Sequence, residues 1–250
     1  MLLVTGALGN LGRVLVPMLL SRGHFVRAIV KPGSKGKARE YYASHKHLTP
    51  AMKKQIQFWE LDLADETAKN KEMMKKACFL CDTVIHLAGL VDYSASKKTL
   101  LEANYFTTKN LLEASRMARV KKFIYASSTS VYCQPQYLPI NEKHPFTPTN
   151  DYGKTKMLAE HAIQTSGVPY VILRLSALYG PTFLHNYSTL FEKIFLGKQP
   201  IIGDGYNRVT FLHANDASRA FLAAIKSEKL NQAYIICSEE KLTQKLCLQI

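Results

Sequence analysis

The stretch Thr5-Gly-Ala-Leu-Gly-Asn-Leu-Gly12 decides the fold of this chain. It follows a short apolar run at residues 1–5 and precedes residues 11–20, whose apolar side chains recur at helical spacing. A glycine-rich turn between a strand and a helix brings backbone N–H groups and the positive end of the helix dipole to a pyrophosphate. We therefore expect a dinucleotide-binding turn. Its contact residues would be Gly6, Gly9, Asn10, Leu11 and Gly12.

Each glycine of the turn has a separate physical role. Gly6 permits a sharp exit from the strand, Gly9 allows close approach to a phosphate, and Gly12 lets the helix pack against the strand. The turn lacks the Gly-Lys-Ser/Thr of a P-loop, which disfavours nucleotide hydrolysis. A purely structural turn is the other interpretation, and the position between strand and helix favours the dinucleotide.

Strand and helix patterns alternate along the chain. Strands are expected at 1–5, 24–30, 56–61, 83–88, 122–127 and 170–175, and helices at 11–20, 38–44, 66–76, 100–118 and 152–165. This alternation predicts an α/β fold with a doubly wound parallel sheet, the Rossmann type, over residues 1–175.

Beyond residue 176 the alternation weakens. Helices at 183–196 and 217–226 and a strand at 233–237 predict a small substrate-binding lobe, residues 176–250, that partly returns to the core. The last ten residues begin an amphipathic pattern and end inside it, so we expect this lobe to be truncated.

The composition is that of a globular protein. Of the 250 residues 47% are hydrophobic and 21% charged, and no run reaches 18 apolar residues, so we expect a cytoplasmic protein without a membrane partner. Five cysteines at irregular spacing do not suggest a disulfide framework. The pair Cys78-Phe-Leu-Cys81 lacks the second ligand pair of a zinc site, so buried thiols are expected there and no metal.

The formal net charge of +14 is unevenly distributed, because residues 1–54 contain ten Lys or Arg and a single acid, Glu40. Such an excess could bind nucleic acid or could line a phosphate pocket. No nucleic-acid motif accompanies the charge, so we expect the phosphate pocket and no nucleic-acid partner.

The position of the basic residues bears on the choice of cofactor. NAD-binding turns are followed about twenty residues later by an acid that binds the adenosine ribose. Here that neighbourhood carries Arg27, Lys31 and Lys35 instead, which would suit a 2′-phosphate, so NADP is favoured and NAD stays possible. After the third expected strand come Asp62 and Leu63, and Asp62 could accept from the adenine amino group or lie in a solvated turn.

A tyrosine four residues before a lysine occurs at several positions, among them Tyr93, Tyr105 and Tyr152. On a helix this spacing places a phenol and an ammonium on one face. The spacing alone does not say which of the three takes part in chemistry.

Six motifs in register resolve the choice. They are TGALGNLG at 5–12, Asp62-Leu63, His86-Leu-Ala-Gly89, Ser127-Ser-Thr-Ser-Val-Tyr132, Tyr152-Gly-Lys-Thr-Lys156 and Arg174-Leu-Ser-Ala-Leu-Tyr-Gly-Pro181. Over essentially its whole length the chain resembles the extended short-chain dehydrogenase/reductase family, in its epimerase/dehydratase branch.

The resemblance implies that Ser128, Tyr152 and Lys156 are catalytic. It also implies that Tyr152 and Lys156 contact the cofactor together with Leu87, Ala88 and Gly89, and that Ser128 and Thr129 contact the substrate. Asn104 resembles the family's asparagine that braces the neighbouring helix, although an ordinary helix asparagine fits the pattern nearly as well. Tyr93 and Tyr105 are then chance matches with packing or surface roles.

Elementary electrostatics supports the choice of Tyr152. A phenol titrates near pH 10, so a base that works near pH 7 needs its pKa lowered by about three units, or about 4 kcal/mol. Lys156 lies one turn further along the expected helix, and the helix dipole also favours an anion in the first turn. We expect Lys156 to lower the pKa of Tyr152.

The substrate end of the chain leaves alternatives open. The segment 203–216 resembles the family segment whose arginine contacts a substrate diphosphate, which would be Arg208; a surface arginine is the other interpretation. Arg208 stands one position earlier than in the commonest epimerase form, and a similar segment occurs in relatives that act on hydroxysteroids or dihydroflavonols.

The resemblance therefore predicts an NAD(P)-dependent epimerase or dehydratase that acts on a small molecule, a nucleotide sugar, as a possible homodimer. An NADP-dependent reductase or dehydrogenase of a bulky secondary alcohol and a non-catalytic dinucleotide-binding module are the alternatives.

Overall fold

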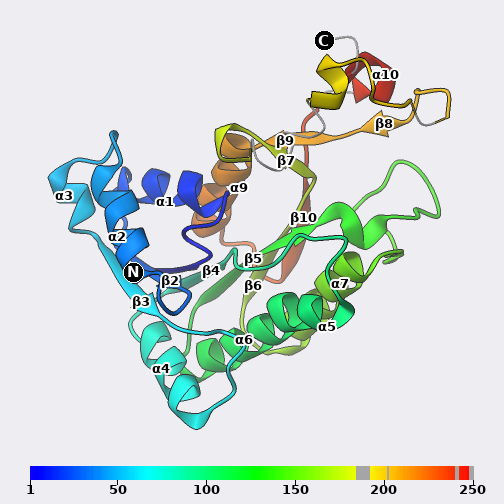
Figure 1. Cartoon of the computed structure of the whole chain (residues 1–250). Helices are drawn as coiled ribbons and strands as arrows, with labels where there is room; N and C mark the ends of the chain where they lie inside the picture. Colours follow the sequence, from blue (N-terminus) through cyan, green and yellow to red (C-terminus); the bar gives the residue numbers. More distant parts are fainter. Residues whose placement is uncertain (184–191, 202, 240–241, 248–250) are drawn as a thin grey trace.

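A parallel sheet of seven strands forms the centre of the computed structural model, which describes residues 1–183, 192–201, 203–239 and 242–247 (Figure 1). The strand order is β10-β6-β5-β4-β1-β2-β3, and every neighbouring pair is parallel. The strands are β1 (Leu2–Thr5), β2 (Val26–Val30), β3 (Ile56–Glu60), β4 (Thr83–His86), β5 (Lys122–Ser128), β6 (Tyr170–Leu175) and β10 (Gln232–Ile236). The predicted doubly wound parallel sheet is confirmed.

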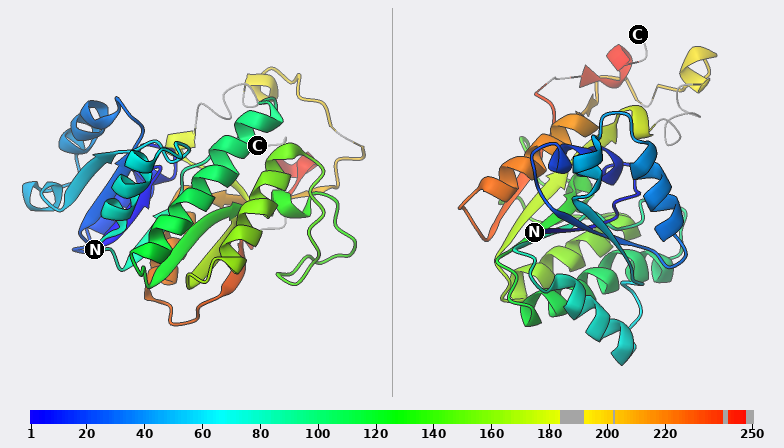
Figure 2. Two further views of the ribbon diagram at one scale, coloured as in Figure 1. Left: turned by 90° about the horizontal axis from the view of Figure 1, so that it is seen from below. Right: turned by 90° about the vertical axis from the view of Figure 1, so that its left-hand side faces the viewer.

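Helices cover both faces of the sheet (Figures 1 and 2). One face carries α1 (Gly12–Leu20), α2 (Lys35–Ser44) and α9 (Ala214–Lys226), and the other carries α4 (Ala68–Cys78), α6 (Thr107–Met117) and α7 (Asp151–Thr165). A short helix, α3 (Pro50–Lys53), follows α2. Each face has its own apolar core, and burial of each large apolar side chain there contributes about 1.5–3 kcal/mol.

The strand order reverses between β1 and β4, because chain order proceeds from β1 to β3 on one side and continues from β4 to β10 on the other. Every residue of these two strands is buried, as expected for a parallel sheet covered on both faces. The carboxyl ends at such a reversal form the crevice in which α/β proteins bind ligands.

The predicted helix at 100–118 is not continuous. The structure has α5 (Lys97–Leu100), then a π-helical turn at Leu101–Phe106, and then α6. The turn contains Asn104, whose side chain is directed into the protein and makes three hydrogen bonds there. A single π turn in an otherwise α-helical stretch often marks a functional site.

The C-terminal segments lie beyond the carboxyl edge of the sheet (Figure 1). There β7 (Ala177–Tyr179) pairs with β9 (Phe211–His213), and β8 (Arg208–Val209) pairs with β11 (Leu242–Thr243), which leads into α10 (Gln244–Cys247). β10 joins the central sheet beside β6. Most of the predicted helix 183–196 lies outside the described residues, although residues 192–195 are helical. The domain boundary at 175/176 stays a prediction.

In the part of the chain that the structure describes, neither a membrane-spanning helix nor a cluster of metal-ligating side chains is present. No helix there is long and apolar enough to cross a membrane, and no group of three or more His, Cys, Asp or Glu could hold a metal ion. Cys78 and Cys81 are buried free thiols, as predicted, and burial raises the pKa of Cys78 to about 12.

A buried ion pair joins helix α7 to the sheet. The guanidinium of Arg174 on β6 donates to both carboxylate oxygens of Glu160 on α7, with Nη2 2.7 Å from Oε2, and both side chains are almost fully buried. Ser127 Oγ donates to Glu160 Oε1 at 2.5 Å, and Arg174 also contacts the hydroxyl of Tyr132. Every oxygen of the buried carboxylate therefore has a partner, as a buried charge requires.

We predict that Glu160→Ala lowers the free energy of unfolding by about 3–5 kcal/mol, because it leaves the Arg174 guanidinium buried without its counter-ion. Asp216→Ala is the control, since Asp216 pairs with Arg219 at the surface and its loss should cost less than about 1 kcal/mol. Urea denaturation of the three proteins measures both values. Equal stabilities for the two variants would contradict the role given to the buried pair.

Candidate active site

The glycine turn is closely packed against the end of β4. Gly6 has φ +68°, and a Cβ atom there would lie 2.8 Å from the backbone nitrogen of Ala88. A Cβ atom on Gly12 would lie 2.2 Å from the carbonyl oxygen of Gly6, so helix α1 can begin this close to the turn only with glycine. The N–H of Gly9 donates to the Gly6 carbonyl at 2.9 Å and closes the turn.

This geometry fits a dinucleotide pyrophosphate. Gly9 is exposed, and α1 has no acidic residue in its first turn. The N-terminus of α1 lies next to the glycine turn, and the turn lies at the topological switch point of the sheet. The hydroxyl of Tyr42 on α2 donates to the carbonyl of Ala7 at 2.7 Å and fixes the turn from outside. The predicted contacts of Gly6, Gly9, Asn10, Leu11 and Gly12 with a cofactor stay predictions.

The predicted role of Arg27 is wrong. Arg27 lies near the amino end of β2, and its Nη1 donates to the carbonyls of Ala77 and Phe79 at the C-terminus of α4, at 2.6 and 2.9 Å. The guanidinium also lies over the ring of Trp59. Residues at the amino end of a parallel strand lie away from the carboxyl-end crevice, so Arg27 neutralises a helix C-terminus and does not reach a ribose phosphate.

Lys31 and Lys35 lie where the sequence predicted them, directly after β2. Lys31 is exposed, and Lys35 begins α2. Glu60, which ends β3 in register with Val30, was not predicted from the sequence. Its Oε1 accepts from the backbone N–H of Lys35 at 2.8 Å, so an acid lies at the N-terminus of α2 beside the predicted 2′-phosphate position.

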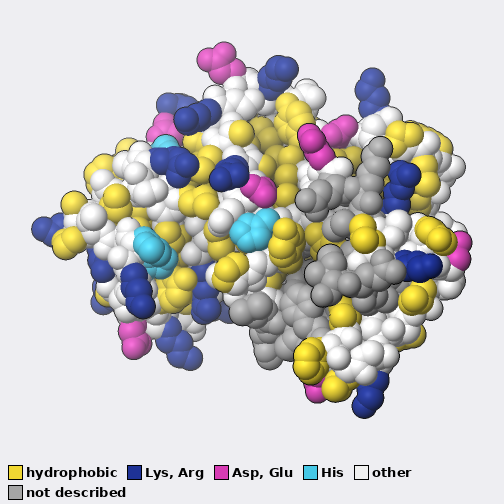
Figure 3. Space-filling model, turned by 90° about the horizontal axis from the view of Figure 1, so that it is seen from above, with side chains coloured by type: hydrophobic (Ala, Val, Ile, Leu, Met, Phe, Trp, Pro, Cys, Tyr) yellow, Lys and Arg dark blue, Asp and Glu magenta, His cyan; other side chains and the backbone are white. Residues whose placement is uncertain are grey.

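Basic side chains also surround this region more widely. Figure 3 shows Lys and Arg gathered on the side of the molecule that carries α2 and α3, in agreement with the basic excess of residues 1–54.

Asp62 and Leu63 follow β3. Asp62 is exposed and its Oδ1 accepts from the N–H of Ala64 at 2.9 Å, which forms a local turn. Leu63 is buried, and its carbonyl accepts from Asn110 of α6 at 3.0 Å. Both contacts fix the backbone at this edge of the sheet, and contact of these residues with an adenine stays a prediction.

The His86-Leu-Ala-Gly segment is held by a buried polar network. His86 Nδ1 lies 2.7 Å from Thr5 Oγ1 and its Nε2 lies 3.0 Å from Thr108 Oγ1. The N–H of Ala88 donates to Thr5 Oγ1 at 3.1 Å, so the segment that follows β4 is tied to the end of β1. Burial lowers the pKa of His86 to about 3, and the imidazole is neutral at pH 7.

Asn104 connects the same segment to helix α7. Its Oδ1 accepts from Leu90 N–H at 2.7 Å, and its Nδ2 donates to the Leu90 carbonyl and to Thr155 Oγ1. The bracing role of Asn104 is confirmed. A Cβ atom on Gly89 would lie 2.8 Å from Asn104 Oδ1 and 3.5 Å from Lys156 Nζ, so the segment Leu87, Ala88 and Gly89 ends directly beside helix α7.

Helix α7 presents Tyr152 in its first turn. Asn150 caps the helix, with its Oδ1 accepting from Gly153 N–H at 2.7 Å, and Asp151 places a negative charge at the N-terminus. A Cβ atom on Gly153 would lie 2.4 Å from the carbonyl oxygen of Ser130. The glycine after the tyrosine is therefore what allows α7 to approach the end of β5.

Ser128 and Tyr152 meet in this contact. Ser128 is the last residue of β5 and hydrogen-bonds the Tyr152 side chain. Ser128 Oγ also donates to Ser130 Oγ at 3.0 Å and accepts from the Ser130 N–H at 3.1 Å. The structure thus brings together two of the three residues expected to be catalytic.

Lys156 completes the group. Its Nζ donates to the carbonyl of Ala126 at 2.9 Å and to the hydroxyl of Tyr125 at 3.2 Å, and lies 6.0 Å from the centre of the Tyr152 ring. Burial lowers the pKa of Lys156 to about 8, an effect that Glu160 partly offsets.

The expected effect of Lys156 on Tyr152 is not seen in this structure. Burial raises the pKa of Tyr152 above its ordinary value of 10, and the hydrogen bond with Ser128 offsets this only in part. The phenol is therefore protonated at pH 7. It can donate a proton as it stands, whereas action as a base requires a further positive charge or hydrogen bond in the site.

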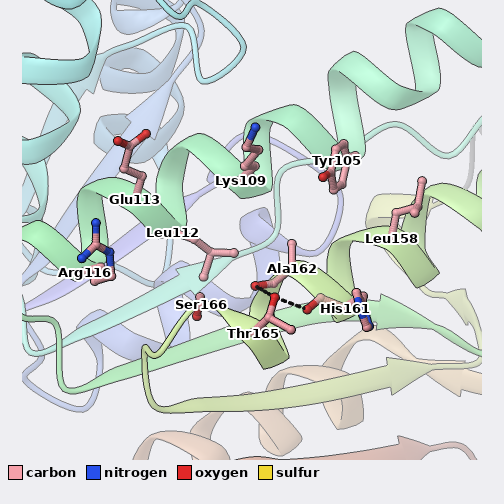
Figure 4. A pocket seen from close by; sticks show the side chains of 10 residues that line it. All are labelled: Tyr105, Lys109, Leu112, Glu113, Arg116, Leu158, His161, Ala162, Thr165 and Ser166. Atoms are coloured by element: carbon pink, nitrogen blue, oxygen red, sulfur yellow. Dashed lines mark hydrogen bonds between the residues drawn. The ribbon is translucent and has the colours of Figure 1, made fainter.

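Two other tyrosines with the same spacing, Tyr93 and Tyr105, differ from each other. The Tyr93 ring packs edge-on against Tyr152 with centroids 5.6 Å apart, a contact that the sequence did not predict. Tyr105 lines a surface groove of about 350 Å³ between α6 and α7 (Figure 4). That groove contains neither Ser128 nor Tyr152, so it is separate from the candidate site.

Thr129 and Arg208 were predicted to contact substrate. Thr129 directly follows Ser128, is half-buried and begins the 3₁₀ helix Thr129–Tyr132. Arg208 is exposed at the start of β8. Substrate contact by either residue stays a prediction.

The sheet is doubly wound and has a glycine turn at its switch point. A serine lies at the end of β5, and a tyrosine and a lysine lie in the first two turns of α7. Together these features define a protein of the short-chain dehydrogenase/reductase type. Residues 2–237 match the NAD dependent epimerase/dehydratase family, an enzyme family of the extended type, and the chain belongs to it.

Three similar proteins illustrate the relationship. A protein of Methanocaldococcus jannaschii with a provisional UDP-glucose 4-epimerase name is 30% identical over 92% of this chain and 76% of its own length. The UDP-glucose 4-epimerase of Bos taurus is 35% identical over 65% of this chain, and the match spans only 47% of the bovine enzyme. The solved structure of UDP-glucuronic acid 4-epimerase from Bacillus cereus in complex with NAD is 26% identical, with a TM-score of 0.78 over 98% of this chain and 80% of that one.

We predict that His86 makes the folded protein sensitive to mild acid. Below pH 6.5 the unfolded chain binds a proton that the folded protein, with its His86 pKa of about 3, does not bind. Stability should therefore fall by about 2 kcal/mol between pH 7 and pH 5 through this residue alone.

The measurement is urea denaturation at both pH values for the wild-type protein and for His86→Gln, in which no imidazole remains at this position. The variant should lose about 2 kcal/mol less than the wild type over this range. An unchanged pH dependence in the variant would contradict the assignment.

Proposed function

We propose that this protein is an NAD(P)-dependent epimerase or dehydratase that acts on a nucleotide sugar. The proposal is supported above all by the contact of Ser128 with Tyr152 beside Lys156, at the same edge of the sheet as the glycine turn. Family membership and the functions of the relatives, which include UDP-glucose epimerases, support the substrate class.

The residues that would hold the dinucleotide are those of the glycine turn, the segment after β4 and Lys156. A bound nicotinamide ring supplies the acceptor and donor of a hydride in this chemistry. Lys156 is positioned by Ala126 and Tyr125 on one side and passes beside Gly89 on the other, which orients its ammonium toward the segment that we expect to line the cofactor.

In this proposal the proton chemistry belongs to Tyr152 and Ser128. Ser128 holds the substrate oxygen by a hydrogen bond, and the Tyr152 phenol exchanges a proton with that oxygen as hydride leaves or returns at the adjacent carbon. Because Tyr152 is protonated in the free protein, the proton-donating direction needs no prior change, whereas the proton-accepting direction requires the pKa of Tyr152 to fall when the site fills.

Charges of opposite sign lie near the predicted 2′ position of the cofactor. Lys31 and Lys35 favour a 2′-phosphate, whereas the Glu60 carboxylate at the N-terminus of α2 opposes it and could accept from a 2′-hydroxyl. We infer a preference for NADP that Glu60 makes smaller than the basic composition alone suggests. The Bacillus cereus enzyme was solved in complex with NAD, which describes the cofactor of that protein.

We propose that Arg208 contacts the substrate diphosphate and that Thr129 contacts the substrate. We also propose that the protein acts in the cytoplasm and forms a homodimer. The alternative of an NADP-dependent reductase draws on the same basic residues after β2.

We predict that Tyr152→Phe lowers the rate of interconversion of UDP-glucose and UDP-galactose by about 10²–10⁴-fold, the usual contribution of a positioned acid/base. Its dinucleotide affinity should stay within a few-fold, because the ring remains in place. Tyr105→Phe, which removes a hydroxyl from the α6–α7 groove, is the matched control and should leave turnover unchanged.

Steady-state kinetics and fluorescence titration with the dinucleotide measure the two effects. Turnover retained in Tyr152→Phe would overturn the site assignment. A wild-type protein that reduces a bulky ketone with NADPH and does not interconvert the sugars would favour the reductase.

We also predict that the wild-type protein binds NADPH more tightly than NADH. Lys31→Ala should weaken NADPH binding without a matching effect on NADH, and Glu60→Gln should strengthen NADPH binding because it removes a negative charge beside the phosphate. Fluorescence titration of the three proteins with both cofactors gives the ratios. Tighter binding of NADH by the wild type would refute the NADP preference, and Glu60 would then be the residue that reads the ribose.

A further inference from the structure

Tyr93 is an exposed residue in contact with the candidate site. It belongs to the loop between β4 and α5, and its side chain is 67% exposed. Its ring nevertheless packs edge-on against the buried ring of Tyr152, with centroids 5.6 Å apart and planes at 76°. Tyr152 therefore covers one part of the Tyr93 ring, and the rest of that ring is open to solvent.

The hydroxyl of Tyr93 connects to the other catalytic residue. It lies 3.5 Å from Ser130 Oγ, which in turn accepts from Ser128 Oγ at 3.0 Å. Tyr93 thus contacts Tyr152 through its ring and the neighbour of Ser128 through its hydroxyl. A molecule whose oxygen reaches both Ser128 and Tyr152 would also meet the Tyr93 ring.

The loop that carries Tyr93 is held on both sides. Asp92 Oδ1 accepts from the N–H of Ser94 at 2.8 Å and from its hydroxyl at 2.6 Å. Ser96 caps α5, with its Oγ accepting from the N–H of Thr99 at 3.1 Å. These local bonds order the backbone before ligand binds, so a contact with Tyr93 costs little conformational entropy.

We propose that Tyr93 is the aromatic platform on which the apolar face of the substrate's sugar ring packs, so that the sugar, and not the nucleotide, is recognised there. The proposal rests on the proposed function, since it names a subsite for the same substrate. A pyranose ring presents a face of C–H groups to an aromatic ring, and tyrosine combines such a face with a hydroxyl that stays hydrated. The ring, more than the hydroxyl, carries the interaction.

The experiment compares two probes that differ only in the sugar. Isothermal titration with UDP-glucose and with UDP is carried out on the wild type, Tyr93→Ala, Tyr93→Phe and Phe79→Ala. Phe79 is a matched control, because it is also an exposed aromatic residue, 62% exposed, but follows α4 at the opposite edge of the sheet.

Tyr93→Ala should weaken UDP-glucose binding about tenfold and change UDP binding less than about twofold. Tyr93→Phe, which keeps the ring, should bind UDP-glucose within about threefold of the wild type, and Phe79→Ala should match the wild type with both probes. In steady-state kinetics Tyr93→Ala should raise KM by a similar factor.

The outcomes separate the two proposals. UDP-glucose binding unchanged in Tyr93→Ala would overturn the platform while leaving the proposed function intact. An equal loss with UDP and UDP-glucose would also overturn it, because the sugar would not be what the ring recognises. A folded wild-type protein that binds neither probe would overturn the proposed function and this inference together.

Discussion

The position of helix α7 is the constraint on which the site depends, and a buried charge sets it. Glu160 receives three hydrogen bonds from Arg174 and one from Ser127, so the middle of α7 is fixed to β5 and β6 at once. Tyr152 and Lys156 lie two turns and one turn earlier on the same helix. A helix anchored only by apolar packing could slide or rotate by fractions of an ångström at small cost, whereas a bidentate ion pair in a low-dielectric interior tolerates little displacement.

Glycines at three close contacts then bring the remaining parts within reach. Gly12 lets α1 start against the turn, Gly89 lets the segment after β4 pass Asn104 and Lys156, and Gly153 lets α7 approach the carbonyl of Ser130. At each position a single methyl group would overlap backbone or a buried amide. The backbone contacts at Gly12 and Gly153 cannot be relieved by a rotamer change, and the Asn104 amide beside Gly89 is held by three hydrogen bonds. The distance between the glycine turn and helix α7 is therefore set by the absence of side chains.

The sequence predicted what depends on local pattern and missed what depends on neighbours in space. The strands and most helices follow from apolar periodicity, and Ser128, Tyr152 and Lys156 lie in one region as their motifs suggested. Arg27 was misplaced because charge and distance along the chain do not say at which end of a strand a side chain lies. Glu60 was missed because its relation to α2 arises from the register of β2 with β3, and Tyr93 because an exposed loop tyrosine carries no periodic signal. The π turn at Asn104 likewise follows from tertiary hydrogen bonds, since helical propensity favours a continuous helix.

The titration behaviour of the site follows from the same burial that builds it. Desolvation disfavours charge on both members of the pair, raising the pKa of Tyr152 and lowering that of Lys156 to about 8. A site that removes water in this way holds its phenol neutral and its ammonium easily deprotonated until another charged group enters. Lys156 lies beside Gly89 and Ser128 lies beside Tyr152, so both side chains can respond to such a charged group. They line the segments where cofactor and substrate are expected. Proton transfer by Tyr152 should therefore be coupled to occupation of the site, because only then does the balance between desolvation and charge shift toward the phenolate.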